Sequence, residues 1–350
     1  MAVSSRESLG GVSSEGRSYY FGLKRSDYLR YEKKTFTAIK IKSVTDNGAP
    51  PIMESYVASA QDRVIQPTHR FNIDSAGRIR ITPARQHPRG TEYLSDAINE
   101  YTVMGKAFWG EIPTGYPVGI GSFTGLSFMG EPVGFTVIAL ETLEETRISL
   151  ILEKNNDDIL RAGSIEKFRT AFDFLNSMAK SSARILRDMH NQGIIHSNPY
   201  LYNYGRSSSG RIYVHDFSDG KLAGDISRDE FRVRVFNDFR HLYFSTFNSM
   251  VQGADPEQVE LIMRSFKLPS PIENAFGVES TDGYFSKNAA RRIGEDKIRS
   301  AISLKNFMGF ILNFWNEQNL VGRVLSPADH PSIEVLFEFA NSIYDRVGRR

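Results

Sequence analysis

One stretch of the sequence decides the fold: residues 186–203 read LRDMHNQGIIHSNPYLYN. Its first part has the spacing of a helix and ends at Gly193, a residue type that commonly stops helices. Two isoleucines then predict a short buried strand, and a loop begins at His196. Residues 211–218, RIYVHDFS, follow a Ser-Gly turn and predict a second strand that delivers an acidic residue, Asp216, to its end.

The loop that begins at His196 resembles the catalytic loop of protein kinases. There, a helix ending in His-x-x-Gly leads into His-Arg-Asp, with Asn five residues after the Asp. In this sequence Asn198 stands in the Asp position and Asn203 in the Asn position. The segment from Asp216 resembles Asp-Phe-Gly, with Ser218 in place of Gly. The resemblance implies an ATP site in which Asn203 and Asp216 bind Mg²⁺ or Mn²⁺, because such cations take hard oxygen ligands and share them with phosphates.

The order of strand and helix signals along the chain fits the α+β, bilobal layout that this resemblance implies. Residues 1–18 are rich in serine and predict a disordered tail. Residues 19–144 are rich in strand signals and contain one amphipathic helix, predicted over 91–109, so they form the expected N-lobe. Residues 145–350 are mostly helical and form the expected C-lobe, with the catalytic-loop-like segment at 194–220.

The N-lobe is expected to supply a cation for the phosphates and an acid that orients it. The strand around Lys40, TAIK, resembles the Val-Ala-Ile-Lys strand of kinases, and Glu100 on the predicted helix is the expected partner. The alternative cation is Arg80, in a hairpin strand before that helix, an arrangement similar to the selenoprotein-O-like branch. Both remain open. Backbone groups at Glu141 are expected to form the adenine hinge.

Asn198 changes the expected chemistry, because an asparagine accepts a hydrogen bond but takes up no proton at neutral pH. Loss of a general base costs roughly 10²–10⁴ in rate. Three explanations stay open: a pseudokinase scaffold that binds nucleotide and regulates a partner, an atypical transferase that moves a phosphoryl or nucleotidyl group, and an engineered base knockout. The acceptor is a protein or a small molecule. His196 is expected to pack the loop instead of replacing the base.

Two other acids are candidates for supporting roles. Asp238 in the next predicted helix is a candidate brace for the loop backbone, or a helix N-terminal acid stabilised by the dipole. Asp219 is a second acid or, as we favour, a turn residue.

Composition excludes several other classes of protein. The 350 residues carry 43 basic and 41 acidic side chains, and this near balance argues against a nucleic-acid partner. No apolar run reaches the roughly 20 residues that span a bilayer. The sequence has no cysteine, which excludes disulfides and thiolate metal sites. We expect a cytoplasmic protein, although a serine-rich start is also compatible with a secreted bacterial effector.

Overall fold

The computed structural model divides the chain into two compact units, which are described separately. The first unit comprises Met1–Asn72, Ile81–Glu145 and Asp216–Gly220, and the second comprises Ile73–Arg80, Thr146–His215 and Lys221–Arg350. The residues that the structure describes are 12–15, 18–44, 69–74, 76–83, 91–142, 146–148, 151, 161, 164–251, 283–285 and 324–348.

A six-stranded antiparallel sheet forms the first unit. Its strand order is β1-β2-β5-β10-β8, and β9 also pairs with β10. In β5 (Ala38–Lys42) every second residue is buried, the period expected for one face of a strand that packs inward. The other strands are β1 (Val12–Glu15), β2 (Ser18–Gly22), β8 (Glu92–Tyr93), β9 (Tyr116–Phe128) and β10 (Glu131–Leu140). A separate ribbon joins β3 (Leu29–Tyr31) to β4 (Lys34–Phe36), after the 3-10 turn η1 (Arg25–Asp27).

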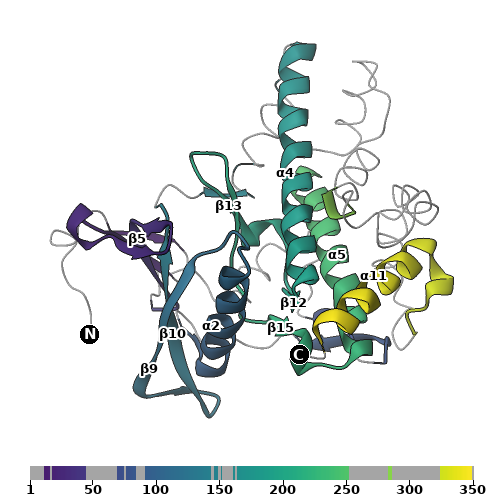
Figure 1. Cartoon of the computed structure of the whole chain (residues 1–350), viewed down its shortest axis with the longest axis horizontal. Helices are drawn as coiled ribbons and strands as arrows, with labels where there is room; N and C mark the ends of the chain where they lie inside the picture. Colours follow the sequence, from purple (N-terminus) through teal and green to yellow (C-terminus); the bar gives the residue numbers. More distant parts are fainter. Residues whose placement is uncertain are drawn as a thin grey trace. The chain divides into compact units, whose positions relative to one another are not determined.

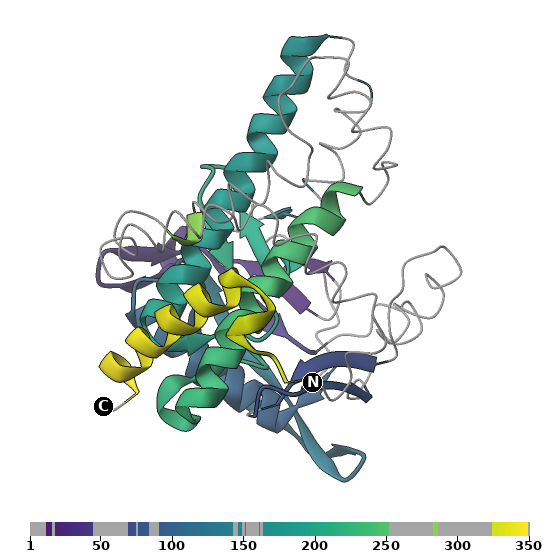
Figure 2. The same cartoon turned by 90° about the vertical axis from the view of Figure 1, so that its right-hand side faces the viewer.

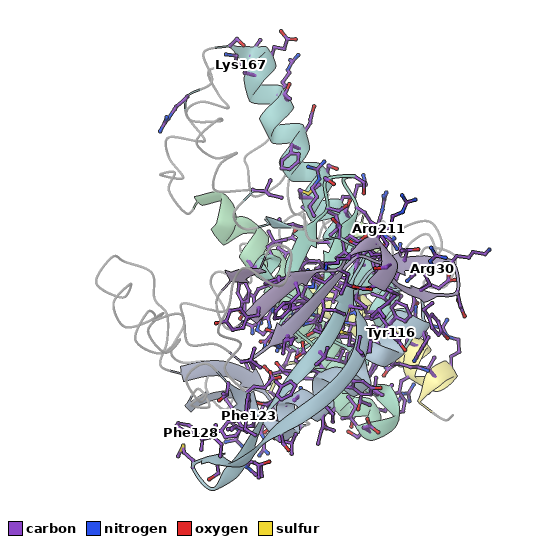
Figure 3. The ribbon with its side chains drawn as sticks, turned by 90° about the vertical axis from the view of Figure 1, so that its left-hand side faces the viewer. Arg30, Tyr116, Phe123, Phe128, Lys167 and Arg211 are labelled. Atoms are coloured by element: carbon purple, nitrogen blue, oxygen red, sulfur yellow. The ribbon has the colours of Figure 1, made fainter. Side chains whose placement is uncertain are left out.

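Strands β9 and β10 form a long hairpin (Figure 1). Phe123 and Phe128 lie toward the tip of this hairpin, and Tyr116 lies at the other end of β9 (Figure 3). The ring of Phe123 contacts Phe135 on the partner strand at 5.2 Å between centroids. The Phe135 ring packs over Gly121, where no larger residue fits, because a Cβ at Gly121 would lie 2.2 Å from that ring.

Helix α2 (Leu94–Trp109) packs beside β9 and β10 (Figure 1). It confirms the amphipathic helix predicted over 91–109. Asp96 lies in its first turn, where an acid is favoured by the helix dipole, and Gly110 follows its last residue. Phe108 near its end packs with Phe36 and Ala139 in an apolar cluster. This packing fixes the helix against the sheet and so fixes the position of its buried acid, Glu100.

The hairpin predicted before α2 is confirmed as β6 (His69–Ile73) paired with β7 (Ile79–Pro83). Asp74 organises its turn by accepting hydrogen bonds from the backbone N–H groups of Ala76 and Arg78, both at 3.0 Å. The hydrogen bond from Arg78 is the main reason why the pKa of Asp74 lies below its usual value of 3.8.

The second unit is built mainly from helices. Helix α4 (Ile165–Asn191) is capped by Ser164, which accepts a hydrogen bond from the backbone of Lys167, as the sequence predicts. Helix α11 (Pro331–Val347) packs against α5 (Arg228–Val251) (Figure 2). Short strands flank α4 in the chain: β12 (Ile194–Ile195) pairs with β15 (Lys221–Leu222), and β13 (Tyr204–Arg206) pairs with β14 (Ile212–Val214) and with β11 (Thr146–Arg147), which precedes α4. The 3-10 turns are η3 (Leu201–Asn203), η4 (Ala223–Asp225) and η7 (Pro327–Asp329).

Within the described residues, the structure has a β-rich part that contains helix α2 and a mainly helical part, which is the predicted α+β class. The structure places β1 at Val12–Glu15, inside the predicted tail over 1–18, and residues 1–11 lie outside the described residues. No helix within the described residues is long and apolar enough to cross a membrane.

Candidate functional site

A buried lysine, Lys42, is the centre of an ionic group in the first unit. Its Nζ lies 2.8 Å from Glu100 Oε2, 2.6 Å from Asp216 Oδ1 and 3.7 Å from Glu92 Oε2. The side chains of Lys42, Glu100 and Glu92 are 9%, 1% and 2% exposed, whereas that of Asp216 is 35% exposed. The group therefore joins β5, α2, β8 and the segment that follows β14, and Asp216 is its accessible member.

This ionic group corrects the predicted partner of Glu100, which is Lys42 and neither Lys40 nor Arg80. Lys40 lies two positions earlier on β5, and its Nζ lies 5.4 Å from the centre of the Tyr20 ring. Arg80 binds Asp74 through its Nε at 3.2 Å, and its side chain is 47% exposed. The reason is geometric: the strand period places Lys40 and Lys42 on one face, so the local motif does not separate them.

Glu92 and Asn99 are two site residues that the sequence reasoning missed. Glu92 also accepts a hydrogen bond from Thr136 on β10 at 3.0 Å, which holds its buried carboxylate beside Lys42. Asn99 donates through Nδ2 to the carbonyl oxygens of Ser218, at 2.7 Å, and Gly220, at 2.9 Å. The amide of α2 thus holds the segment that follows Asp216. Its position next to Glu100 was the available signal.

The backbone at Asp216 is held in a left-handed conformation, with φ of 63°. A non-glycine residue seldom adopts this region, and such residues cluster at functional sites. Ser218 donates to Asp216 Oδ1 at 3.0 Å, so the residue in the Gly position contacts the acid itself. Asp219 lies in the turn that follows, as predicted, and the N–H of Gly220 closes this turn on the carbonyl of Phe217 at 2.9 Å.

Asp238 on α5 braces the catalytic-loop-like segment in the second unit, which confirms the first of its two predicted roles. Its Oδ2 accepts from the backbone N–H of His196 at 2.8 Å, and its Oδ1 accepts from that of Ser197 at 2.8 Å. His190 at the end of α4 contacts Oδ2 through Nε2 at 3.0 Å and Tyr284 through Nδ1. The carboxylate is fully buried, so these bonds replace the water it loses.

His196 packs the loop, as expected, and is fully buried. Its Nε2 donates to the carbonyl of His215 at 2.8 Å, and its Nδ1 accepts from the N–H of Asn198 at 3.3 Å. With both ring nitrogens engaged in this way, the imidazole supports the loop and is not placed as a base. Ser197 beside it has φ of 70°, a second left-handed non-glycine residue.

Asn203 is 1% exposed and is fixed by the loop in which it lies. Its Nδ2 donates to the carbonyl of Asn198 at 2.8 Å. Its own carbonyl accepts from the N–H of His215 at 2.8 Å. His215 directly precedes Asp216 in the chain.

Burial shifts the pKa of three further groups in the second unit. It raises the pKa of Tyr284 and of Tyr204 well above the usual 10.0, and the negative charge of Asp238 adds to both shifts. The hydroxyl of Tyr204 has no hydrogen-bond partner among the described residues. Burial also lowers the pKa of Arg240, on α5, to about 10.

Glu141, the expected hinge residue, directly follows β10. Its carbonyl accepts from the hydroxyl of Thr37 at 2.9 Å, and the carbonyl of Leu140 accepts from the N–H of Thr37 at 3.0 Å. Among the described residues no group of three or more His, Cys, Asp or Glu side chains is placed to hold a metal ion.

The sequence matches no protein-family model and no curated protein. Among solved structures, the chain is similar to WaaP in complex with acyl carrier protein, with 17% identity, a TM-score of 0.40, and coverage of 78% of this chain and 95% of WaaP. It is also similar to the ROP18 kinase domain in complex with AMP-PNP and sucrose, with 12% identity, a TM-score of 0.40, and coverage of 97% and 81%.

The order of elements and the local geometry define the class of fold. A sheet that packs against helix α2 carries a lysine–glutamate pair, and a mainly helical part carries a loop held by a buried aspartate. This is a protein-kinase-like fold.

Proposed function

We propose that this protein binds ATP with Mg²⁺ or Mn²⁺ and acts as an atypical transferase, moving a phosphoryl or nucleotidyl group to a protein or a small molecule. The observation that carries the proposal is the ionic group of Lys42, Glu100 and Asp216. A buried lysine held by a helix acid and by an accessible carboxylate is suited to bind phosphates, because a metal ion bound to that carboxylate would free the lysine for the phosphate oxygens.

Each residue then has a defined part in binding. Lys42 contacts the phosphates, and Glu100 fixes its ammonium group. Asp216 and Asn203 are the proposed metal ligands, since they offer the carboxylate and amide oxygens that Mg²⁺ accepts, and the metal would neutralise phosphate charge. Asp216 fits this role because its carboxylate is partly exposed, and Asn203 fits because its amide nitrogen is engaged elsewhere in its loop. Backbone groups near Glu141 would contact the base.

Asn198 favours a second candidate, a pseudokinase scaffold that binds nucleotide and regulates a partner. Its amide cannot take a proton from an acceptor hydroxyl, and His196 has both ring nitrogens engaged in the loop. Transfer of a phosphoryl group depends largely on positioning and charge neutralisation. Loss of the base therefore lowers the rate of transfer without abolishing it.

Labelled nucleotide separates the two candidates. The full chain is incubated with Mg²⁺ or Mn²⁺ and either γ-labelled or α-labelled ATP, alone and with candidate acceptors. Transfer from the γ position indicates a phosphotransferase, and transfer from the α position indicates a nucleotidyltransferase. Asp216→Asn, which removes the metal-binding charge, should abolish either transfer. Nucleotide binding without any transfer supports the scaffold.

Restoring the acid with Asn198→Asp is the companion experiment. A gain of roughly 10²-fold or more in transfer would show that the site lacks only a general base. An unchanged rate would show that the reaction does not use one. If ATP with metal ions neither binds nor raises the melting temperature, both candidates are wrong.

A further inference from the structure

The ionic group around Lys42 leaves an electrostatic problem for any phosphate ligand. Three carboxylates, from Glu92, Glu100 and Asp216, face one ammonium group within 4 Å, so the group has a formal net charge of −2. A polyphosphate that approaches this group meets repulsion from like charge. Metal ions relieve part of it, and a further cation on the same face of the sheet would relieve more.

Lys40 is such a cation. It lies two residues before Lys42 on β5, so the two side chains leave the strand on the same face, about 7 Å apart along it. Lys40 is only 6% exposed. Among the residues that the structure describes, no carboxylate pairs with it, and its ammonium group lies over the ring of Tyr20. The Lys40 side chain is thus largely enclosed by its neighbours, while its ammonium group faces an aromatic ring and can still pair with an anionic ligand.

Tyr20 holds this lysine in place without neutralising it. Tyr20 on β2 lies directly opposite Lys40 in the strand register, and the ring centre is 5.4 Å from Nζ. That distance is within the roughly 6 Å range of cation–π attraction. The ring thus orients the ammonium group and leaves its charge available to an anion.

We infer that Lys40 is a second anion-binding residue, which contacts the polyphosphate chain of the nucleotide alongside Lys42. This inference rests on the proposed nucleotide site and assigns a division of labour within it. Lys42 is held by acids and is positioned by them, whereas Lys40, which pairs with no carboxylate in the described part of the chain, supplies positive charge that draws the polyphosphate to this face of the sheet.

The test compares Lys40→Met with Lys40→Arg and with Lys33→Met, a control at an exposed turn lysine of the same unit. Dissociation constants are measured for ATP, adenosine and inorganic tripolyphosphate, all with Mg²⁺. Lys40→Met should weaken ATP and tripolyphosphate by about 10- to 100-fold, as expected for a charge-assisted contact, and should leave adenosine unchanged. Lys40→Arg should retain most of the affinity, and Lys33→Met should retain all of it.

Stability of the free protein gives an independent measurement. Methionine keeps the apolar stem and removes a charge that pairs with no carboxylate among the described residues, so Lys40→Met should melt at the same temperature as wild type or higher. A merely structural lysine, held for its contact with Tyr20, would instead make the variant melt lower with unchanged affinities, and that result overturns the inference.

The probes also separate this inference from the proposed function. Wild type that binds tripolyphosphate through Lys40 but not ATP would refute the nucleotide site and keep the anion site. Wild type that binds ATP with no dependence on Lys40, or with equal losses for ATP and adenosine, would keep the nucleotide site and overturn the inference. Binding of neither probe overturns both.

Discussion

Lys42→Met should strongly destabilise the free protein, because it leaves three carboxylates facing one another without their ammonium group. Glu100 and Glu92 are 1% and 2% exposed, so water cannot replace the lost charge. Removing one partner of a buried ion pair typically costs about 3–5 kcal/mol. The share of Asp216, with its side chain 35% exposed, is screened by solvent and adds little.

A double-mutant cycle isolates the pair that the structure identifies. Glu100→Gln alone leaves Lys42 with two carboxylates and should cost less than Lys42→Met. The double variant removes both the cation and the most buried acid, so its destabilisation should be smaller than the sum of the two single effects by about 2–3 kcal/mol. Urea unfolding of the full chain at one pH, followed by fluorescence, measures all four free energies of unfolding.

Lys33→Met, at an exposed turn, should stay within about 0.5 kcal/mol of wild type. If Lys42→Met and Glu100→Gln add within about 0.5 kcal/mol, the two side chains do not interact, and the ionic group is wrong. Lys40→Met combined with Glu100→Gln serves as the matched comparison, because the sequence motif alone paired those two residues; this combination should be additive.

Three further predictions concern the second unit. Asp238→Asn should destabilise by about 2–4 kcal/mol in urea unfolding, because both carboxylate oxygens accept backbone N–H groups and an amide offers only one acceptor; equal stability would contradict the brace. Because burial raises the pKa of Tyr204 and Tyr284, the folded protein keeps both phenol protons above pH 10, where the unfolded chain releases them. The free energy of unfolding should therefore fall by about 1.4 kcal/mol per pH unit for each tyrosine above pH 10. Tyr204→Phe should reduce this slope in unfolding measured from pH 9 to 11. Gly193→Ala should lower the melting temperature more than Gly210→Ala: both have positive φ, but a Cβ at Gly193 lies 2.8 Å from Val347, whereas one at Gly210 meets only the end of the Arg206 side chain at 3.3 Å.

Local patterns in the sequence were sufficient to predict several helices and strands and the loop that begins at His196. The cap at Ser164, the helix that ends before Gly193 and the strand that precedes Asp216 each depend on neighbours a few residues away. The brace at Asp238 could also be anticipated, because the loop backbone needs an acceptor and the next helix offers an acid, although α5 begins at Arg228, well before the start predicted at Asn237. These features were predictable because short-range conformational preferences and hydrogen bonding determine them.

The identity of the lysine partner was decided only by tertiary structure. Lys40 and Lys42 have the same side-chain direction on β5, and the two-residue period of a strand cannot distinguish them. Which of them reaches Glu100 depends on where Phe108 and its apolar neighbours hold α2 along the sheet, 58 residues further on. The same long-range packing brings Glu92 and Asn99 into the site, because burial of a helix against a sheet sets positions that no local pattern encodes.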